Sequence, residues 1–91
     1  MRVLLVEDEV RLAENVANAL RDGPGFAVDC AEDGATGAHL ASDPCYDLIV
    51  LDLMLPGMDG LSLLKRLRAR GVATPVLILT ARNEEIGRAH V

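Results

Sequence analysis

The four apolar residues at positions 48–51 end abruptly in a carboxylate, Asp52, and this junction constrains the fold more than any other feature. A short unbroken apolar run is typical of a strand that is buried on both faces of a parallel sheet. Ligands of open α/β sheets bind at the carboxyl ends of such strands. An acidic group there is costly unless a cation or a reaction stabilises it, so Asp52 is a candidate functional residue.

The rest of the chain alternates short apolar runs with helical patterns. These patterns predict strands at residues 3–6, 26–30, 47–51 and 75–79, and helices at residues 10–21, at residues 34–41 and in the segment after Asp59. Such alternation predicts an α/β fold with a doubly wound parallel sheet, and we expect the strand order 2-1-3-4.

Helix ends and faces can be assigned from residue types. Asp33 and Asp59 are expected to cap the second and third helices, Asn83 is expected to cap a further helix, and Gly71 is expected to end the third. The buried stripe of the third helix is expected to contain Leu61, Leu63, Leu64 and Leu67.

Composition limits the functions that are open to this chain. Its 91 residues form one domain, and the 51% apolar content excludes a disordered chain. A net charge of −5 argues against general binding to nucleic acid or anionic membranes. We find neither a membrane span nor a signal-peptide layout, so we expect a cytoplasmic protein in which Cys30 and Cys45 are free, buried thiols.

Oxygen-bearing side chains follow three of the predicted strands. Glu7 and Asp8 follow the first, Asp52 the third and Thr80 the fourth. In the order 2-1-3-4 these strands are neighbours ~4.8 Å apart, so their ends span roughly 10 Å. Carboxylates ~5 Å apart repel by roughly 3 kcal/mol per pair at an effective dielectric of about 20, and bound Mg²⁺ removes that repulsion. The cluster predicts a magnesium site in which an aspartate attacks a phosphoryl group and a hydroxyl donates to it.

Each residue also has a purely structural interpretation. Asp52 could be a solvated residue beyond a strand, and Thr80 an ordinary turn residue. Glu7 and Asp8 could stabilise the next helix through its dipole. Their joint placement at three neighbouring strand ends favours the functional interpretation.

Three segments, residues 3–9, 47–60 and 75–82, resemble the receiver domain of two-component response regulators, and the resemblance covers residues 1 to about 84. It implies a flavodoxin-like fold in which Asp52 accepts a phosphoryl group from a phosphohistidine on a sensor histidine kinase. It implies Mg²⁺ ligation by Asp8 and Asp52, with the backbone carbonyl of Met54 and with Glu7 often acting through water. Thr80 would be the switch hydroxyl.

The amino-acid sequence of the last two segments is most similar to the transcription-factor branch of the family, whose members carry a winged-helix DNA-binding domain. That domain is not in this chain, so we assign the chain no DNA binding. Receiver domains also carry a lysine on a fifth strand, and Lys65, on the third helix, is no counterpart to it. We therefore expect residues 1–84 to form an incomplete receiver domain without the fifth strand and last helix. The bare edge of the fourth strand would then invite self-association.

Residues 85–91 do not read as the expected helix of the family. They match the in-frame translation of a common sequencing adapter, and we hypothesise a non-native, non-family tail. Two other functions stay open at this point. One is a truncated fragment that does not switch. The other is a phosphatase or phosphotransferase with an aspartyl nucleophile, although such enzymes commonly need a second acid where this chain has Met54.

Overall fold

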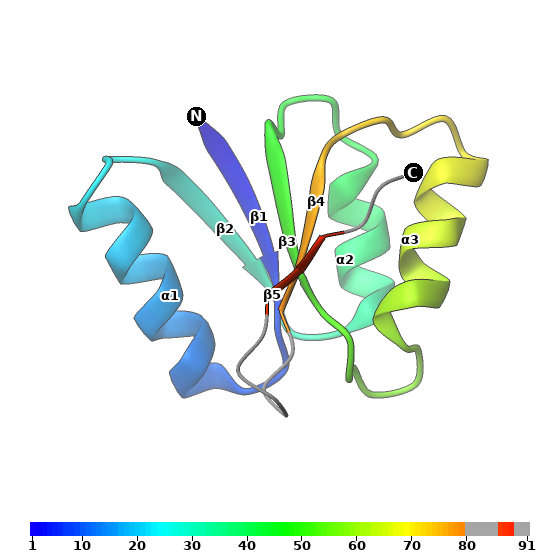
Figure 1. The fold of residues 1–91 in the computed structure, drawn as a ribbon, viewed down its shortest axis with the longest axis horizontal. Helices are drawn as coiled ribbons and strands as arrows, with labels where there is room; N and C mark the ends of the chain where they lie inside the picture. Colours follow the sequence, from blue (N-terminus) through cyan, green and yellow to red (C-terminus); the bar gives the residue numbers. More distant parts are fainter. Residues whose placement is uncertain (80–85, 89–91) are drawn as a thin grey trace.

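The computed structural model describes residues 1–79 and 86–88, and Figure 1 shows a sheet between two layers of helices. Its elements in chain order are β1 (Arg2–Val6), α1 (Val10–Asp22), β2 (Ala27–Ala31), α2 (Gly34–Ala41), β3 (Leu48–Asp52), α3 (Gly60–Ala69), β4 (Val76–Leu79) and β5 (Ile86–Arg88). The predicted strands and the first two helices lie within one residue of these bounds. The helix expected after Asn83 starts outside the described residues.

The strand order is β2-β1-β3-β4-β5, and the first four strands are parallel, as predicted. β5 is a short antiparallel strand that pairs with β4, with Ile78 opposite Gly87. The outer edge of β4 is therefore not bare, in contrast to the expectation of a sheet that ends at the fourth strand. Pairing of this kind depends on contacts between distant segments, and no local pattern in the tail indicates it.

The sheet is covered on both faces, as a doubly wound fold requires. In Figure 1, α1 lies on one face, and α2 and α3 lie side by side on the other. The core under α1 contains Val3, Leu5, Ala13, Ala17, Val28 and Val50. The larger core under α2 and α3 is centred on fully buried side chains, among them Leu4, Val6, Ile49, Leu51, Leu63 and Leu67. Successive residues of β1 and β3 alternate between the two cores, which explains their unbroken apolar runs.

Carboxylates cap each of the three helices in the described part of the chain. The side chains of Asp33 and Asp59 accept hydrogen bonds from the backbone N–H groups of Thr36 and Ser62, as predicted. The cap of α1 is Glu9, which accepts from the N–H groups of Arg11 and Leu12. Glutamate is not among the residues that commonly cap helices, so residue type alone does not indicate this cap.

Two expectations about burial are wrong. Leu61 is 51% exposed, because a helix turns about 100° per residue and Leu61 falls beside the stripe of Leu63, Leu64 and Leu67. Cys30 and Cys45 are free thiols but exposed. Cys30 lies on the edge strand β2 and Cys45 in the loop before β3, so neither reaches a core. None of the helices that the structure describes is long and apolar enough to cross a membrane.

A polar brace of Arg2, Asp29 and Tyr46 lies toward the amino edge of the sheet. The Arg2 guanidinium lies 2.9 Å from the Asp29 carboxylate, and the Tyr46 hydroxyl donates to the same oxygen at 2.7 Å. The guanidinium carbon is 5.8 Å from the centre of the Tyr46 ring. The hydrogen bonds from Tyr46 and Arg2 lower the pKa of Asp29, whereas burial and Asp29 raise the pKa of Tyr46 to about 12. The brace connects β1, β2 and the loop before β3.

Candidate functional site

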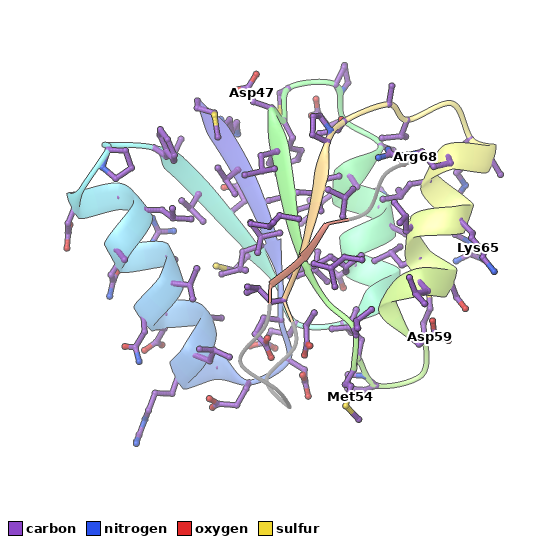
Figure 2. The ribbon with its side chains drawn as sticks, viewed as in Figure 1. Asp47, Met54, Asp59, Lys65 and Arg68 are labelled. Carbon is purple, nitrogen blue, oxygen red and sulfur yellow. The ribbon has the colours of Figure 1, made fainter. Side chains whose placement is uncertain are left out.

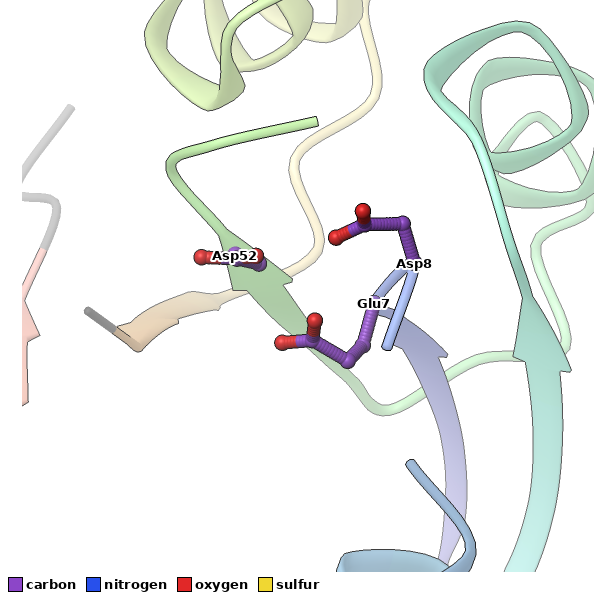
Figure 3. A group of neighbouring side chains, drawn as sticks. All are labelled: Glu7, Asp8 and Asp52. Atoms are coloured by element: carbon purple, nitrogen blue, oxygen red, sulfur yellow. The ribbon is translucent and has the colours of Figure 1, made fainter. Parts of the chain in front are cut away.

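Three carboxylates meet at the opposite, carboxyl edge of the sheet. Glu7 and Asp8 directly follow β1, and Asp52 is the last residue of β3, which pairs with β1 in parallel register. Each offers an oxygen atom, and these atoms all lie within 4.8 Å of one another. Figure 3 shows the three side chains converging from the two strands. The structure thus brings together the three acids that the sequence places at adjoining strand ends.

The acids of this cluster differ in burial, and none of them pairs with a basic side chain that the structure describes. Glu7 is 4% exposed and Asp52 7%, whereas Asp8 is exposed. Glu7 accepts a hydrogen bond from the backbone N–H of Glu9 at 3.0 Å, and Asp52 accepts one from the N–H of Met54 at 3.3 Å. Among the side chains that the structure describes, the only ion pair is the one between Arg2 and Asp29. The negative charge of the cluster is therefore not neutralised by those side chains.

The pKa of Glu7 shows the electrostatic cost of this arrangement. Burial, and to a smaller extent the neighbouring Asp52 carboxylate, raise the pKa of Glu7 to about 7, against the opposing hydrogen bond from the Glu9 N–H. Burial and a like charge both disfavour the ionised form of a carboxyl group. Two carboxylates at one strand-end site are thus poorly stabilised by the protein alone, which is the situation that a bound cation relieves.

The donor set fits a hard divalent cation. Only oxygen ligands are present, and two of the three carboxylates are almost fully buried. Mg²⁺ prefers oxygen ligands and is usually held by one or two carboxylates while it keeps several waters. Glu7, Asp8 and Asp52 would hold it. Met54 lies next to the cluster through its N–H bond to Asp52, its side chain is 54% exposed, and its carbonyl stays a predicted ligand.

Two further residues of the sequence analysis, Thr80 and Lys65, remain to be located. Thr80 lies outside the described residues. Lys65 is an exposed side chain on α3, the helix on which the sequence places it (Figure 2).

The sequence analysis did not single out Gly60, the first residue of α3. A Cβ atom built on Gly60 would lie 2.6 Å from the carbonyl oxygen of Asp52. The available signal was a glycine in a first helical turn, where it costs stability relative to alanine and therefore indicates a close backbone approach.

Comparison with known proteins identifies the family. The sequence profile described as "Response regulator receiver domain" matches residues 3–91. The transcriptional regulatory protein TctD of Salmonella typhimurium is 52% identical over 83 residues, which are 91% of this chain and 37% of that protein. The transcriptional activator protein IrlR of Burkholderia pseudomallei is 51% identical over 84 residues, which are 92% of this chain and 36% of that protein. The chain spans little more than a third of the length of these curated relatives.

Solved structures agree on the fold. The receiver domain of the Francisella response regulator 1452 superimposes with a TM-score of 0.83 at 36% identity, over 91% of this chain and 68% of that one. The response regulator TrrA of Thermotoga maritima, described in complex with Mg²⁺–BeF, has a TM-score of 0.81 at 31% identity, over 90% of this chain and 70% of that one. The profile match, the relatives and the shared flavodoxin-like topology together show that this chain belongs to the response regulator receiver domain family.

Proposed function

We propose that this chain is the phospho-acceptor domain of a two-component phosphorelay, in which Asp52 takes a phosphoryl group from a sensor histidine kinase. One observation carries the proposal: Asp52 is almost fully buried at the end of β3, and its oxygen lies within 4.8 Å of those of Glu7 and Asp8. A buried acid with two acidic neighbours is destabilising in a protein that only needs to fold. It is well suited to holding a divalent cation beside a phosphoryl acceptor.

The residues of the site divide the work in the proposed reaction. One oxygen of Asp52 forms the new bond to phosphorus, the phosphorus–nitrogen bond of the phosphohistidine breaks, and the nitrogen keeps the electron pair. The product is an acyl phosphate. The backbone N–H of Met54 donates a hydrogen bond to Oδ1 of Asp52 and so helps to orient the carboxylate. Glu7, Asp8 and the Met54 carbonyl would hold Mg²⁺ with Asp52, and Thr80 would supply the switch hydroxyl.

Bound Mg²⁺ would neutralise charge on the acceptor and on the anionic phosphoryl group. The Mg²⁺–BeF complex of the Thermotoga maritima relative supports this choice of cation. The chain would act as a self-phosphorylating acceptor rather than as a conventional enzyme.

The partners follow from the same family. Because the curated relatives are transcriptional regulators, we propose that the parent protein controls transcription through a winged-helix DNA-binding domain outside this chain. The kinase would be the direct partner, and the cytoplasm the place of action. The boundary at residue 84 and the non-native origin of residues 85–91 stay predictions, which the nucleotide sequence beyond codon 84 tests.

Labelling with a small phosphodonor in the presence of Mg²⁺ tests the acceptor role. We expect wild type to incorporate one acid-stable, base-labile phosphoryl group and Asp52→Asn to incorporate none. Asp47→Asn is the matched control, since Asp47 is an exposed aspartate at the other end of the same strand (Figure 2). It should label as wild type does. Equal labelling of Asp52→Asn and wild type would contradict the proposal.

A second candidate is a receiver fragment that does not switch. The observation in its favour is that no basic side chain in the described part of the chain pairs with Glu7, Asp8 or Asp52. Absence of label in both wild type and Asp47→Asn, with the fold intact by circular dichroism, would support this candidate.

A further inference from the structure

The start of α3 lies directly against the end of β3, and Gly60 is the contact point. Gly60 is buried, and its N–H donates to the carbonyl of Leu53 at 2.8 Å, which closes the loop of residues 53–59. A Cβ atom on Gly60 would lie 2.6 Å from the Asp52 carbonyl oxygen and 2.9 Å from the Leu53 Cα. Such distances are shorter than real Cβ contacts, so a side chain at this position forces a displacement.

Both sides of this contact are backbone that is held in place. β3 lies inside the sheet and pairs with β1 on one side and β4 on the other. α3 is held by the Asp59 cap at its first turn and by the fully buried side chains of Leu63 and Leu67. A methyl group at position 60 therefore cannot be accommodated by the rotation of a side chain. Either the backbone at residues 52–53 or the first turn of the helix has to move.

The two close glycines of α2 differ in this respect. A Cβ on Gly37 would meet the side chain of Val6 at 2.9 Å, and one on Gly34 would meet the side chain of Met58 at 3.0 Å. Side chains can adjust, although at some cost in packing. Gly60 is the close approach that transmits strain to the backbone of Asp52.

We propose that Gly60 is a positioning residue for the acidic cluster, and that its missing side chain sets where the Asp52 carboxylate and Met54 lie relative to Glu7 and Asp8. This inference rests on the proposed function, because it assigns Gly60 to the same site. Displacing residues 52–54 separates ligands on β3 from those after β1, so the cation affinity of the site should fall. Loss of a supporting contact around a metal site typically costs about 10- to 100-fold in affinity.

Magnesium titration of two alanine variants at opposite ends of α3 tests the inference. Gly60→Ala should weaken Mg²⁺ binding by about tenfold or more in isothermal titration calorimetry. Gly71→Ala is the matched control, because Gly71 has a φ of +82° and no heavy atom within 4 Å of the added Cβ. That variant should lose stability through backbone strain yet bind Mg²⁺ as wild type does. Wild-type affinity in Gly60→Ala would overturn the inference.

The amide resonance of Met54 provides a readout that needs no metal. The Met54 N–H donates a hydrogen bond to Asp52 within the displaced segment. Its resonance should therefore shift in Gly60→Ala and not in Gly71→Ala. If wild type binds no Mg²⁺, the proposed function fails, while the amide comparison still decides the role of Gly60. An unshifted Met54 amide would refute that role. Trimethylamine N-oxide favours folded states and is added if Gly60→Ala is unstable. Failure to fold even then, with Gly71→Ala folded, would show a general structural role and overturn the inference.

Discussion

The amino and carboxyl edges of the same sheet handle charge in opposite ways. Toward the amino edge, Asp29 is bonded to both Arg2 and Tyr46, and its pKa is lowered. At the carboxyl edge, Glu7 lies beside Asp52 without a basic partner among the described side chains, and its pKa is raised. At the amino edge the acid is bonded to side chains of the protein itself, whereas at the carboxyl edge the acids can still bind a cation. The contrast supports our proposal that the carboxyl edge is the functional one, because an arrangement that serves folding alone gains nothing from it.

The largest expected change in the free energy of unfolding follows truncation of Tyr46 at the amino edge. Tyr46 is 7% exposed and belongs to the core under α2 and α3. Tyr46→Ala removes a buried ring and leaves a cavity, so we expect a loss of about 3–5 kcal/mol in the free energy of unfolding, measured by urea denaturation. Tyr46→Phe keeps the ring and loses only the hydrogen bond to Asp29, for which about 1 kcal/mol is expected. An alanine variant as stable as wild type would show that the brace is not structural.

A smaller change in the free energy of unfolding, in the stabilising direction, is expected on substitution of Glu7 at the carboxyl edge. The pKa of Glu7 is raised from 4.5 to about 7, so without metal its contribution to stability is fully present below pH 4.5 and is lost as the pH rises through 7. The side chain of the Glu7→Gln variant is neutral at every pH, so the variant should be as stable as wild type at pH 4. Above pH 7 the variant should be more stable by roughly 1–2 kcal/mol, a figure that discounts the full pKa shift for screening by water.

Urea denaturation of wild type and Glu7→Gln at several pH values, with chelator present, measures this difference. Asp29→Asn is the control at the other edge. Because the pKa of Asp29 is lowered, its contribution is present above its unfolded value of 3.8 and is lost as the pH falls further. The control should therefore be less stable than wild type at pH 8. Equal stability of Glu7→Gln and wild type at pH 8 would contradict the account of the carboxyl edge.

Local patterns were sufficient to predict the four parallel strands and the acids at their ends. Residues 48–51 form a core strand because every side chain is apolar, and Asp52 is the last residue of that strand. The caps Asp33 and Asp59 were predictable because aspartate commonly accepts from the first helical turn. Such features depend on residues that are near one another in the sequence.

The features that could not be predicted depend on segments that are far apart in the sequence. The brace joins Arg2, Asp29 and Tyr46 from three segments, and its geometry follows from how those segments pack. The antiparallel pairing of β5 and the contact of Gly60 with Asp52 have the same origin. Burial of Glu7 between strands also sets its pKa, which composition and spacing do not reveal.

Magnesium titration followed by the amide resonances of the whole chain tests the central claim most directly. We expect saturable shifts confined to the carboxyl edge, at Glu7, Asp8 and residues 52–54, with Arg2 and Asp29 unmoved. We also expect Asp52→Asn to lose these shifts. Shifts of equal size at both edges, or the same titration curve in Asp52→Asn, would contradict the claim that the three carboxylates form one cation site.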